Sequence, residues 1–206
     1  MARAVDFYFD FASPYAYFAL GPIDRLAREH ALTVAWHPLL VWAVLKAHSI
    51  APPMDPPAKR AYFMTDMVRS AAFYGVPYRH PARLPLSSHR AARLYYAIAA
   101  EDPETARAFG RSVFSAFFTE GLDISDETTL VAVAAVHGIG SATAKAGIEG
   151  EIGRERLAMA VDRAVAAKVL GSPFFILDGE PFFGADRIPQ LAWRLSQAQP
   201  PDAPAP

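Results

Sequence analysis

Ser13 stands where the chain could hold a negatively charged group. It follows an aromatic, strand-like run and precedes Pro14, a residue type favoured in the first turn of helices, so it is expected to cap a helix. The free N–H groups of a helix N-terminus attract anions and lower the pKa of a thiol placed there. A serine cannot exchange disulfides, but its hydroxyl can donate a hydrogen bond to a thiolate supplied by another molecule. The local pattern alone still favours a simple helix cap.

A second candidate is the segment Gly171–Phe174, in which Pro173 follows a small residue and precedes a strand-like run. A cis peptide bond could form in this setting. In such a turn the Ser172 backbone would point outward and could pair with an extended peptide, as an added strand does. The alternative is that Pro173 only begins an edge strand, where its missing N–H is tolerated.

Charged residues elsewhere could bind the ends of a small zwitterionic ligand. In the segment Phe183–Arg187, Gly184 allows close approach and Asp186 is placed to open a helix. Helix N–H groups could then bind a carboxylate while Asp186 binds an ammonium group. The alternative is an ordinary N-cap aspartate. Lys46 could bind a substrate carboxylate if it faced the serine, and is otherwise a solvated surface lysine.

The elements that must position these residues are predicted from hydrophobic periodicity. Residues 5–11 alternate as a strand, residues 15–30 have helical spacing, and residues 32–37 form a second strand. The chain therefore opens with a β-α-β unit, which builds parallel strand pairs. The pattern is then helical from residue 41 to about residue 170. The predicted helices of this region span 41–47, 57–74, 88–100, 103–119, 126–137, 140–146 and 149–169.

Strand patterns return near the end of the chain. Residues 174–177 and 181–183 are predicted strands, and Asp178–Gly179 between them is a hairpin turn signal. Asp186 is expected to cap a final helix over residues 187–197. The predicted fold class is therefore α/β, a thioredoxin-like domain with a large all-helical insertion. The domain bounds that follow are 1–40 and 170–199 for the discontinuous thioredoxin-like domain, 41–169 for the helical insertion and 200–206 for a flexible tail.

Composition and charge restrict the possible functions. The chain has 206 residues, 52% of them apolar, and a formal net charge of −1, so we expect a packed core and no nucleic-acid binding. It has no cysteine, so its own side chains cannot perform thiol redox chemistry. The six histidines lack i, i+4 spacing, and no metal site is expected. No apolar run is long enough to span a membrane and no signal peptide is recognised, so the expected location is the cytoplasm.

Taken together, these motifs resemble those of one family. The run Asp6–Phe11 followed by Ser13-Pro14-Tyr15 is similar to the opening of the 2-hydroxychromene-2-carboxylate isomerases and the related kappa-class glutathione transferases, relatives of the bacterial disulfide oxidases in the thioredoxin superfamily. The later motifs that match in order and spacing are Gly75-Val76-Pro77, Gly171-Ser172-Pro173 and Gly184-Ala185-Asp186-Arg187. The resemblance covers residues 5–197. The chain departs from the family in having no asparagine, where relatives often carry a Gly-Asn pair after the lysine.

The resemblance implies a bound glutathione and a role for each candidate residue. Ser13 would correspond to the family's catalytic serine, which hydrogen-bonds the glutathione sulfur. Ser172, before the expected cis-Pro173, would pair its backbone with the cysteinyl part. Lys46 and Tyr15 would lie beside the substrate. The residues that would hold the γ-glutamyl group are Phe183, Gly184, Ala185 and Asp186.

The function that the resemblance implies is a glutathione-dependent isomerization in aromatic hydrocarbon catabolism. A small aromatic carboxylate, 2-hydroxychromene-2-carboxylate, would interconvert with trans-o-hydroxybenzylidenepyruvate through reversible addition of the glutathione thiolate, which Ser13 steadies. A homodimer is expected, as in the family. Two alternatives stay open: a kappa-like transferase that consumes glutathione, and a redox-inactive thioredoxin-fold binding module without turnover.

Overall fold

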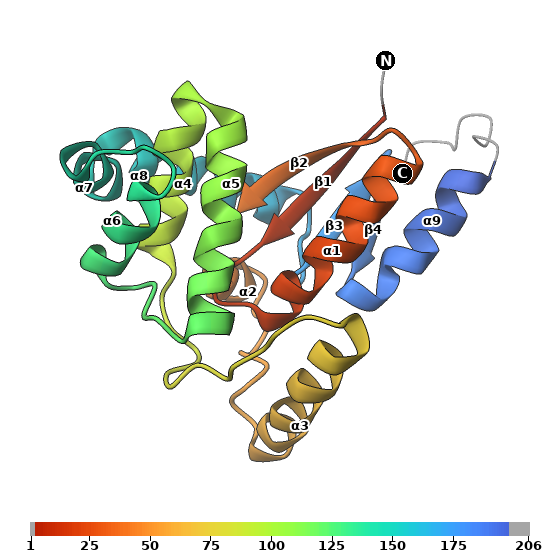
Figure 1. Cartoon of the computed structure of the whole chain (residues 1–206). Helices are drawn as coiled ribbons and strands as arrows, with labels where there is room; N and C mark the ends of the chain where they lie inside the picture. Colours follow the sequence, from red (N-terminus) through yellow and green to blue (C-terminus); the bar gives the residue numbers. More distant parts are fainter. Residues whose placement is uncertain (1–2, 198–206) are drawn as a thin grey trace.

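A four-stranded mixed sheet forms the centre of the molecule in a computed structural model that describes residues 3–197 (Figure 1). The strands are β1 (Ala4–Phe9), β2 (Thr33–Pro38), β3 (Phe174–Leu177) and β4 (Glu180–Phe183), in the order β2-β1-β3-β4. The central strand β1 pairs parallel with β2 and antiparallel with β3. This arrangement confirms the predicted α/β class and all four predicted strands. The predicted tail over 200–206 lies outside the described residues.

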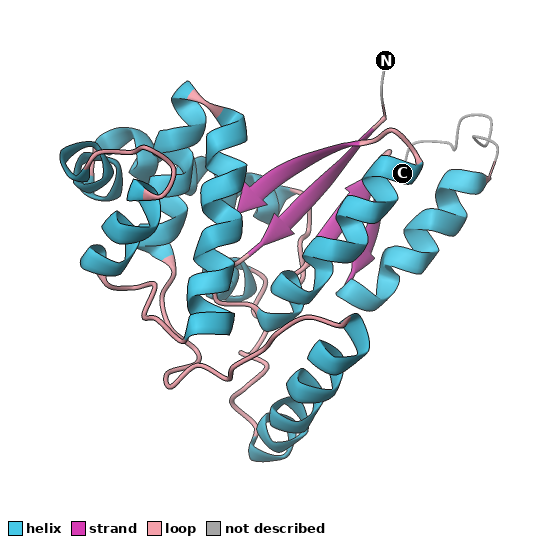
Figure 2. Cartoon of the chain, viewed as in Figure 1, coloured by secondary structure: helices cyan, strands magenta, loops and turns pink. Residues whose placement is uncertain are grey.

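Helices surround this sheet (Figure 2). The helices α1 (Pro14–Glu29) and α9 (Ile188–Ser196) lie side by side on one face. The remaining helices come between β2 and β3 in the chain, as predicted for the insertion. They are α2 (Val41–Ala47), α3 (Pro57–Tyr74), α4 (His89–Glu101), α5 (Pro103–Ser115), α6 (Glu127–Ala135), α7 (Ser141–Glu149) and α8 (Glu151–Ala166). Among residues 3–197, no helix is long and apolar enough to cross a membrane.

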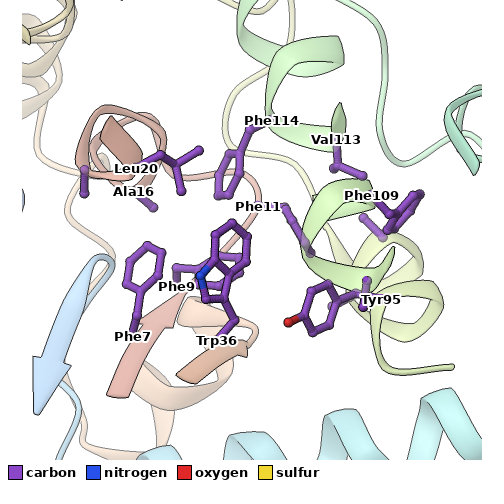
Figure 3. Close-up of a cluster of buried hydrophobic side chains, with 14 of the residues drawn as sticks. Phe7, Phe9, Phe11, Ala16, Leu20, Trp36, Tyr95, Phe109, Val113 and Phe114 are labelled. Carbon is purple, nitrogen blue, oxygen red and sulfur yellow. The ribbon is translucent and has the colours of Figure 1, made fainter. Parts of the chain in front are cut away.

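The alternation of β1 divides the core between the two faces of the sheet. Phe7 and Phe9 point to the same face because strand residues two apart share a face, and their rings lie 4.7 Å apart. Phe9 also packs edge-on against Trp36 of β2 at 5.1 Å and against Phe114 of α5 at 5.5 Å (Figure 3). The insertion and the sheet therefore share one hydrophobic core, which holds the start of α1 in place.

The opposite face is covered by α2 and α8. Tyr8 of β1 packs there in a smaller cluster with Leu39, Val44 and Phe174, together with Ala164 of α8. Phe174 directly follows the Ser172-Pro173 turn, so this cluster anchors the turn from below the sheet. Burial of apolar area contributes about 25 cal/mol per Å², which makes this anchoring favourable.

Several predicted boundaries differ from the structure by a few residues: the helix predicted over 149–169 spans Glu151–Ala166, and the helix predicted over 140–146 extends to Glu149. The strand predicted over 5–11 ends at Phe9, because the Asp10 carboxylate accepts the Ala12 N–H at 2.9 Å and the Asp10 carbonyl accepts the Ser13 N–H at 2.9 Å. The helix predicted over 103–119 changes to a π-helix from Ala116 to Glu120.

The predicted role of Asp186 as a helix cap is also wrong. Asp186 lies in a short 3₁₀ turn over Ala185–Arg187, and α9 begins at Ile188 without any side-chain cap. The hairpin prediction is confirmed. Asp178 and Gly179 both have positive φ, 51° and 83°, as a type I′ turn requires.

Candidate active site

Ser13 has two hydrogen-bonding roles at the start of α1. Its oxygen accepts the N–H of Ala16 at 3.3 Å, so the residue is a helix N-cap as its local sequence indicates. Its hydroxyl also donates to the main-chain carbonyl of Ser172 at 2.9 Å, 159 residues away in the chain. The cap therefore faces the second candidate motif, and the structure brings these two predicted sites together.

The peptide bond between Ser172 and Pro173 is cis, as the sequence suggested. Three bonds fix this turn: the Ser172 carbonyl accepts from Ser13, the Ser172 hydroxyl accepts the Asp10 N–H at 2.9 Å, and the Pro173 carbonyl accepts the Gly184 N–H at 3.1 Å. Within residues 3–197, the N–H of Ser172 has no main-chain partner. The half-buried Ser172 thus retains a free donor beside the Ser13 hydroxyl.

The junction between β4 and α9 forms the next edge of the site. Gly184 has a φ of 112°, a backbone conformation that residues with a side chain rarely adopt. The ring of Phe183 lies over Gly171, where an added Cβ would meet it at 2.5 Å, and Phe183 as a residue is 52% exposed. Ala185 is buried. The Asp186 carboxylate is 68% exposed and lies 3.2 Å from the guanidinium of Arg187.

Asp10 is a site residue that the motif analysis missed. Its side chain is almost fully buried, with 3% of the residue exposed. The carboxylate accepts hydrogen bonds from the N–H groups of Ala12 and Val41, both at 2.9 Å, and from the Ser88 hydroxyl at 2.5 Å. Burial raises the pKa of this carboxyl above its ordinary value, although these hydrogen bonds act in the opposite direction. The sequence signal that could have indicated Asp10 is an acidic residue directly after a predicted strand and three residues before Ser13.

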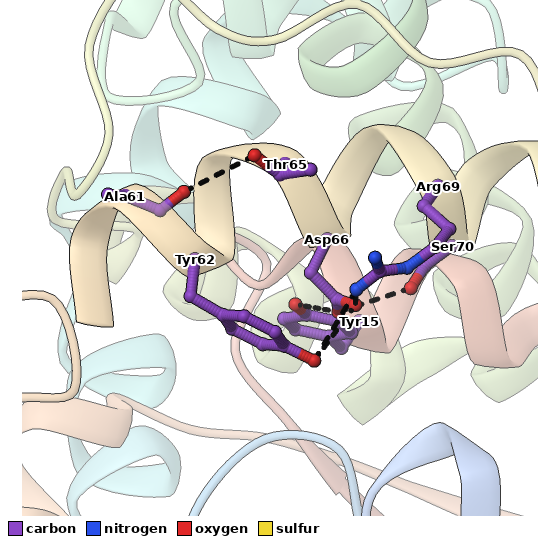
Figure 4. Close-up of polar contacts among 7 residues, drawn as sticks. All are labelled: Tyr15, Ala61, Tyr62, Thr65, Asp66, Arg69 and Ser70. Atoms are coloured by element: carbon purple, nitrogen blue, oxygen red, sulfur yellow. Dashed lines mark hydrogen bonds and ion pairs between the residues drawn. The ribbon is translucent and has the colours of Figure 1, made fainter. Parts of the chain in front are cut away.

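The side chain of Tyr15 points towards α3. Its hydroxyl donates to Asp66 at 2.5 Å, and Asp66 also receives bonds from Tyr62, Arg69 and Ser70 (Figure 4). Burial raises the pKa of Asp66, but the bonds from Tyr15 and Arg69 outweigh it and hold this pKa below the usual value. Burial, and then the bond to Asp66, raise the pKa of Tyr15, which keeps its hydroxyl protonated. These contacts tie α3 to the start of α1.

Lys46 is exposed in the last turn of α2, and no hydrogen bond or ion pair joins its side chain to another described residue. A surface hollow elsewhere, between α1, β2 and α5, is lined by Asp24, Arg28, Trp36 and Arg111 among others, and does not include Ser13. The chemistry of the site itself is that of an anion-binding helix start, with one hydroxyl donor and free main-chain groups beside it.

This donor set matches what a bound thiol requires. The Tyr15 N–H in the first turn of α1 has no main-chain acceptor among the residues described, and an anion near Ser13 would meet it together with the hydroxyl. The chain contains no cysteine that could form a mixed disulfide with the thiol. The site can therefore stabilise a thiolate without reacting with it.

Comparison with known proteins places the chain among thioredoxin-like proteins. The model of the DSBA-like thioredoxin domain matches residues 4–196. A solved structure of a 2-hydroxychromene-2-carboxylate isomerase superposes with a TM-score of 0.84 at 29% identity, covering 93% of this chain and 94% of the other.

Two curated relatives also match most of the chain. The 2-hydroxychromene-2-carboxylate isomerase of Pseudomonas putida is 30% identical over 186 residues, which is 89% of this chain and 90% of the relative. Glutathione S-transferase kappa 1 of Caenorhabditis elegans is 25% identical over 210 residues, covering 95% of this chain and 92% of the relative.

Proposed function

The chain belongs to the DSBA-like thioredoxin domain family and, within it, to the 2-hydroxychromene-2-carboxylate isomerases, and we propose that it isomerizes 2-hydroxychromene-2-carboxylate with glutathione as its cofactor. The observation that carries this proposal is the Ser13 hydroxyl, 2.9 Å from the carbonyl that precedes a cis-proline, in a chain without cysteine. A serine in this position can steady a thiolate but cannot become oxidised with it.

The residues around Ser13 fit the parts of glutathione. The free N–H of Ser172, and its carbonyl once the Ser13 hydroxyl turns away from it, would offer the pairing that an extended cysteinyl backbone needs. The exposed Asp186 carboxylate offers a partner for the γ-glutamyl ammonium group. Phe183, Gly184 and Ala185 form the wall beside it, with Gly184 fixed by its bond to Pro173. The polar part of this fit rests on the half-buried Ser172, which has a free N–H, and on the exposed carboxylate of Asp186.

When bound, glutathione supplies a thiolate that adds reversibly to the conjugated double bond of the substrate, so that this bond can rotate before the thiolate leaves. The protein's part is electrostatic. Ser13 donates its hydroxyl proton in a hydrogen bond to the sulfur, and the N-terminus of α1 adds its positive partial charge. Because the Ser13 hydroxyl donates to the Ser172 carbonyl in this structure, it would have to leave that carbonyl in order to donate to a bound thiol.

The remaining parts of the proposal concern the substrate and the setting. Tyr15 and Lys46 are proposed to lie on the substrate side, with the Lys46 ammonium group as the partner of the substrate carboxylate. The protein is proposed to act as a homodimer. It is proposed to work in the cytoplasm, where the glutathione pool keeps thiols reduced.

The test follows the absorbance of the ring-opened product with and without reduced glutathione. The proposal expects the rate to rise with glutathione until the site is saturated, and the glutathione concentration to be unchanged at the end. Equal rates with and without glutathione would contradict it. Oxidised glutathione is the control, since it has no thiol to supply.

A kappa-like transferase is the second candidate, and the 25% identity to a kappa-class relative over 95% of the chain favours it. Such an enzyme would form a stable thioether with an electrophile, so free thiol would disappear in proportion to product. Thiol titration after many turnovers separates the two: constant thiol indicates isomerization, and stoichiometric loss indicates conjugation.

A further inference from the structure

The main chain of Asp10 holds both halves of the proposed thiol site. Its carbonyl accepts the N–H of Ser13 at 2.9 Å, and its N–H donates to the hydroxyl of Ser172 at 2.9 Å. Ser13 and Ser172 are in turn bonded to each other. The three residues therefore form a closed set of hydrogen bonds in which a shift of Asp10 moves both partners.

The side chain of Asp10 connects the same point to the helical insertion. One carboxylate oxygen accepts the N–H of Val41 at the start of α2, and the other accepts the hydroxyl of Ser88 at the start of α4. Ser88 is 1% exposed and makes no cap bond to its own helix, so Asp10 is the partner its hydroxyl has among the described residues. Two helices of the insertion thus begin at a carboxylate that lies directly beneath the site.

We propose that Asp10 is a positioning residue, which holds the helical insertion in a fixed orientation relative to Ser13 and Ser172. The inference rests on the proposed function. This orientation matters for catalysis only if a substrate that contacts the insertion must also meet a thiolate held at Ser13. Asp10 is only 3% exposed, so a direct contact with substrate or cofactor is not part of this role. It acts through Ser13 and Ser172, whose separation it fixes from both sides.

The geometry explains why a carboxylate is needed here and an amide is not sufficient. Both oxygens of Asp10 accept from donors, and the Val41 donor is a main-chain N–H that cannot be reversed. An asparagine would place an NH₂ group against either Val41 or the pair of Ala12 and Ser88. Asp10→Asn therefore removes the hydrogen bond at the start of α2 or the one at the start of α4, while the volume of the side chain is kept.

Three variants separate positioning from general stability. Asp10→Asn breaks the carboxylate bonds, and Ser88→Ala removes only one of them. Asp6→Asn is the matched control, because Asp6 lies on the same strand and pairs with His37 at 2.8 Å, away from the serine pair. Each variant is assayed for isomerization with reduced glutathione, for its melting temperature and for amide hydrogen exchange by mass spectrometry.

We expect kcat to fall about 100-fold in Asp10→Asn and about tenfold in Ser88→Ala, because small displacements of reacting groups have effects of this size. The fraction of folded protein is unchanged at the assay temperature, and Asp6→Asn stays within about twofold of wild type. A purely structural role predicts instead that activity falls only in proportion to the folded fraction, and this result would overturn the proposal.

Hydrogen exchange tests the same inference without any reaction. In Asp10→Asn, we expect faster exchange in peptides that cover residues 11–16, 38–45 and 171–176, and no change in these peptides for Asp6→Asn. Faster exchange confined to residues 38–45 would show that Asp10 only fastens the insertion, and would overturn the positioning role. If wild type has no glutathione-dependent activity, the proposed function fails, while exchange still decides whether Asp10 couples the three segments.

Discussion

The hydroxyl of Ser13 lies 2.9 Å from the carbonyl oxygen of Ser172, and this bond joins the start of α1 to the cis-proline turn. The same oxygen caps α1 through the N–H of Ala16. One side chain thus combines a structural role with a proposed catalytic one, and the two roles can be measured separately.

Ser13→Ala should reduce activity far more than stability. Loss of the N-cap is expected to lower the free energy of unfolding by about 1 kcal/mol. Loss of a hydrogen bond to a thiolate, worth about 1.5–3 kcal/mol, should lower kcat/KM roughly 10- to 100-fold. Urea denaturation and the absorbance assay give the two values. The control is Asp126→Ala, which removes the cap of α6, an oxygen that accepts the Thr129 N–H at 2.9 Å. Equal activity losses in both variants would contradict the role of Ser13.

Asp186→Asn should weaken glutathione binding without affecting folding. The Asp186 carboxylate caps no helix and is 68% exposed, so its charge is available to an ammonium group. We expect the dissociation constant of glutathione to rise about tenfold, in line with a partly solvated charge-assisted hydrogen bond of about 1.5 kcal/mol. Calorimetric titration measures this. Glu180→Gln, which alters another exposed acid paired with an arginine, Arg194, should leave the dissociation constant unchanged.

Gly184→Ala should distort the wall of the proposed site. An added Cβ would clash with the carboxylate of Asp186, and a φ of 112° is unfavourable for any side chain. We expect a loss of at least about 1 kcal/mol of stability and weaker glutathione binding. Gly179→Ala is the matched control, because Gly179 has a φ of 83° and open space around its Cα. It should lose about 1 kcal/mol of stability and bind glutathione normally. Normal binding by Gly184→Ala would show that this wall is not part of the site.

The features predicted correctly from sequence depend on local rules. The N-cap at Ser13 with Pro14 after it, the cis bond before Pro173 and the turn at Asp178–Gly179 each follow from a few adjacent residues. Cap and turn chemistry depends on neighbouring backbone groups, so short patterns contain the information. The cap predicted at Asp186 failed because a 3₁₀ turn comes before α9 and shifts its start to Ile188.

The features that sequence reasoning missed depend on contacts between distant segments. The partner of Asp10, Ser88, is 78 residues away, and the partner of Tyr15, Asp66, is 51 residues away. Neither pairing has a spacing that could be recognised, because it depends on how the insertion packs on the sheet. For the same reason, the side chain at Lys46 could not be placed relative to Ser13 from its position in the chain.

The contact between Tyr15 and Asp66 leads to a prediction about pH. The folded pKa of Asp66 is lowered by the bonds from Tyr15 and Arg69, which exceed the opposing effect of burial. A lowered folded pKa means that the charged group stabilises the fold above its unfolded pKa of about 3.9, and that this contribution is lost as the pH falls through the folded pKa. Asp66→Asn should therefore be less stable than wild type near pH 7, by about 1 kcal/mol because Arg69 is solvent-exposed.

The difference in unfolding free energy between Asp66→Asn and wild type should stay constant from pH 7 to about pH 5 and shrink below about pH 4, where the wild-type carboxylate becomes protonated. Denaturation curves between pH 3 and pH 7 measure it. Asp55→Asn is the control, because Asp55 is exposed just before α3 and its side chain has no hydrogen bond within the described residues. A difference for Asp66→Asn that persists unchanged at pH 3 would mean that the Asp66 charge does not stabilise the contact between α1 and α3.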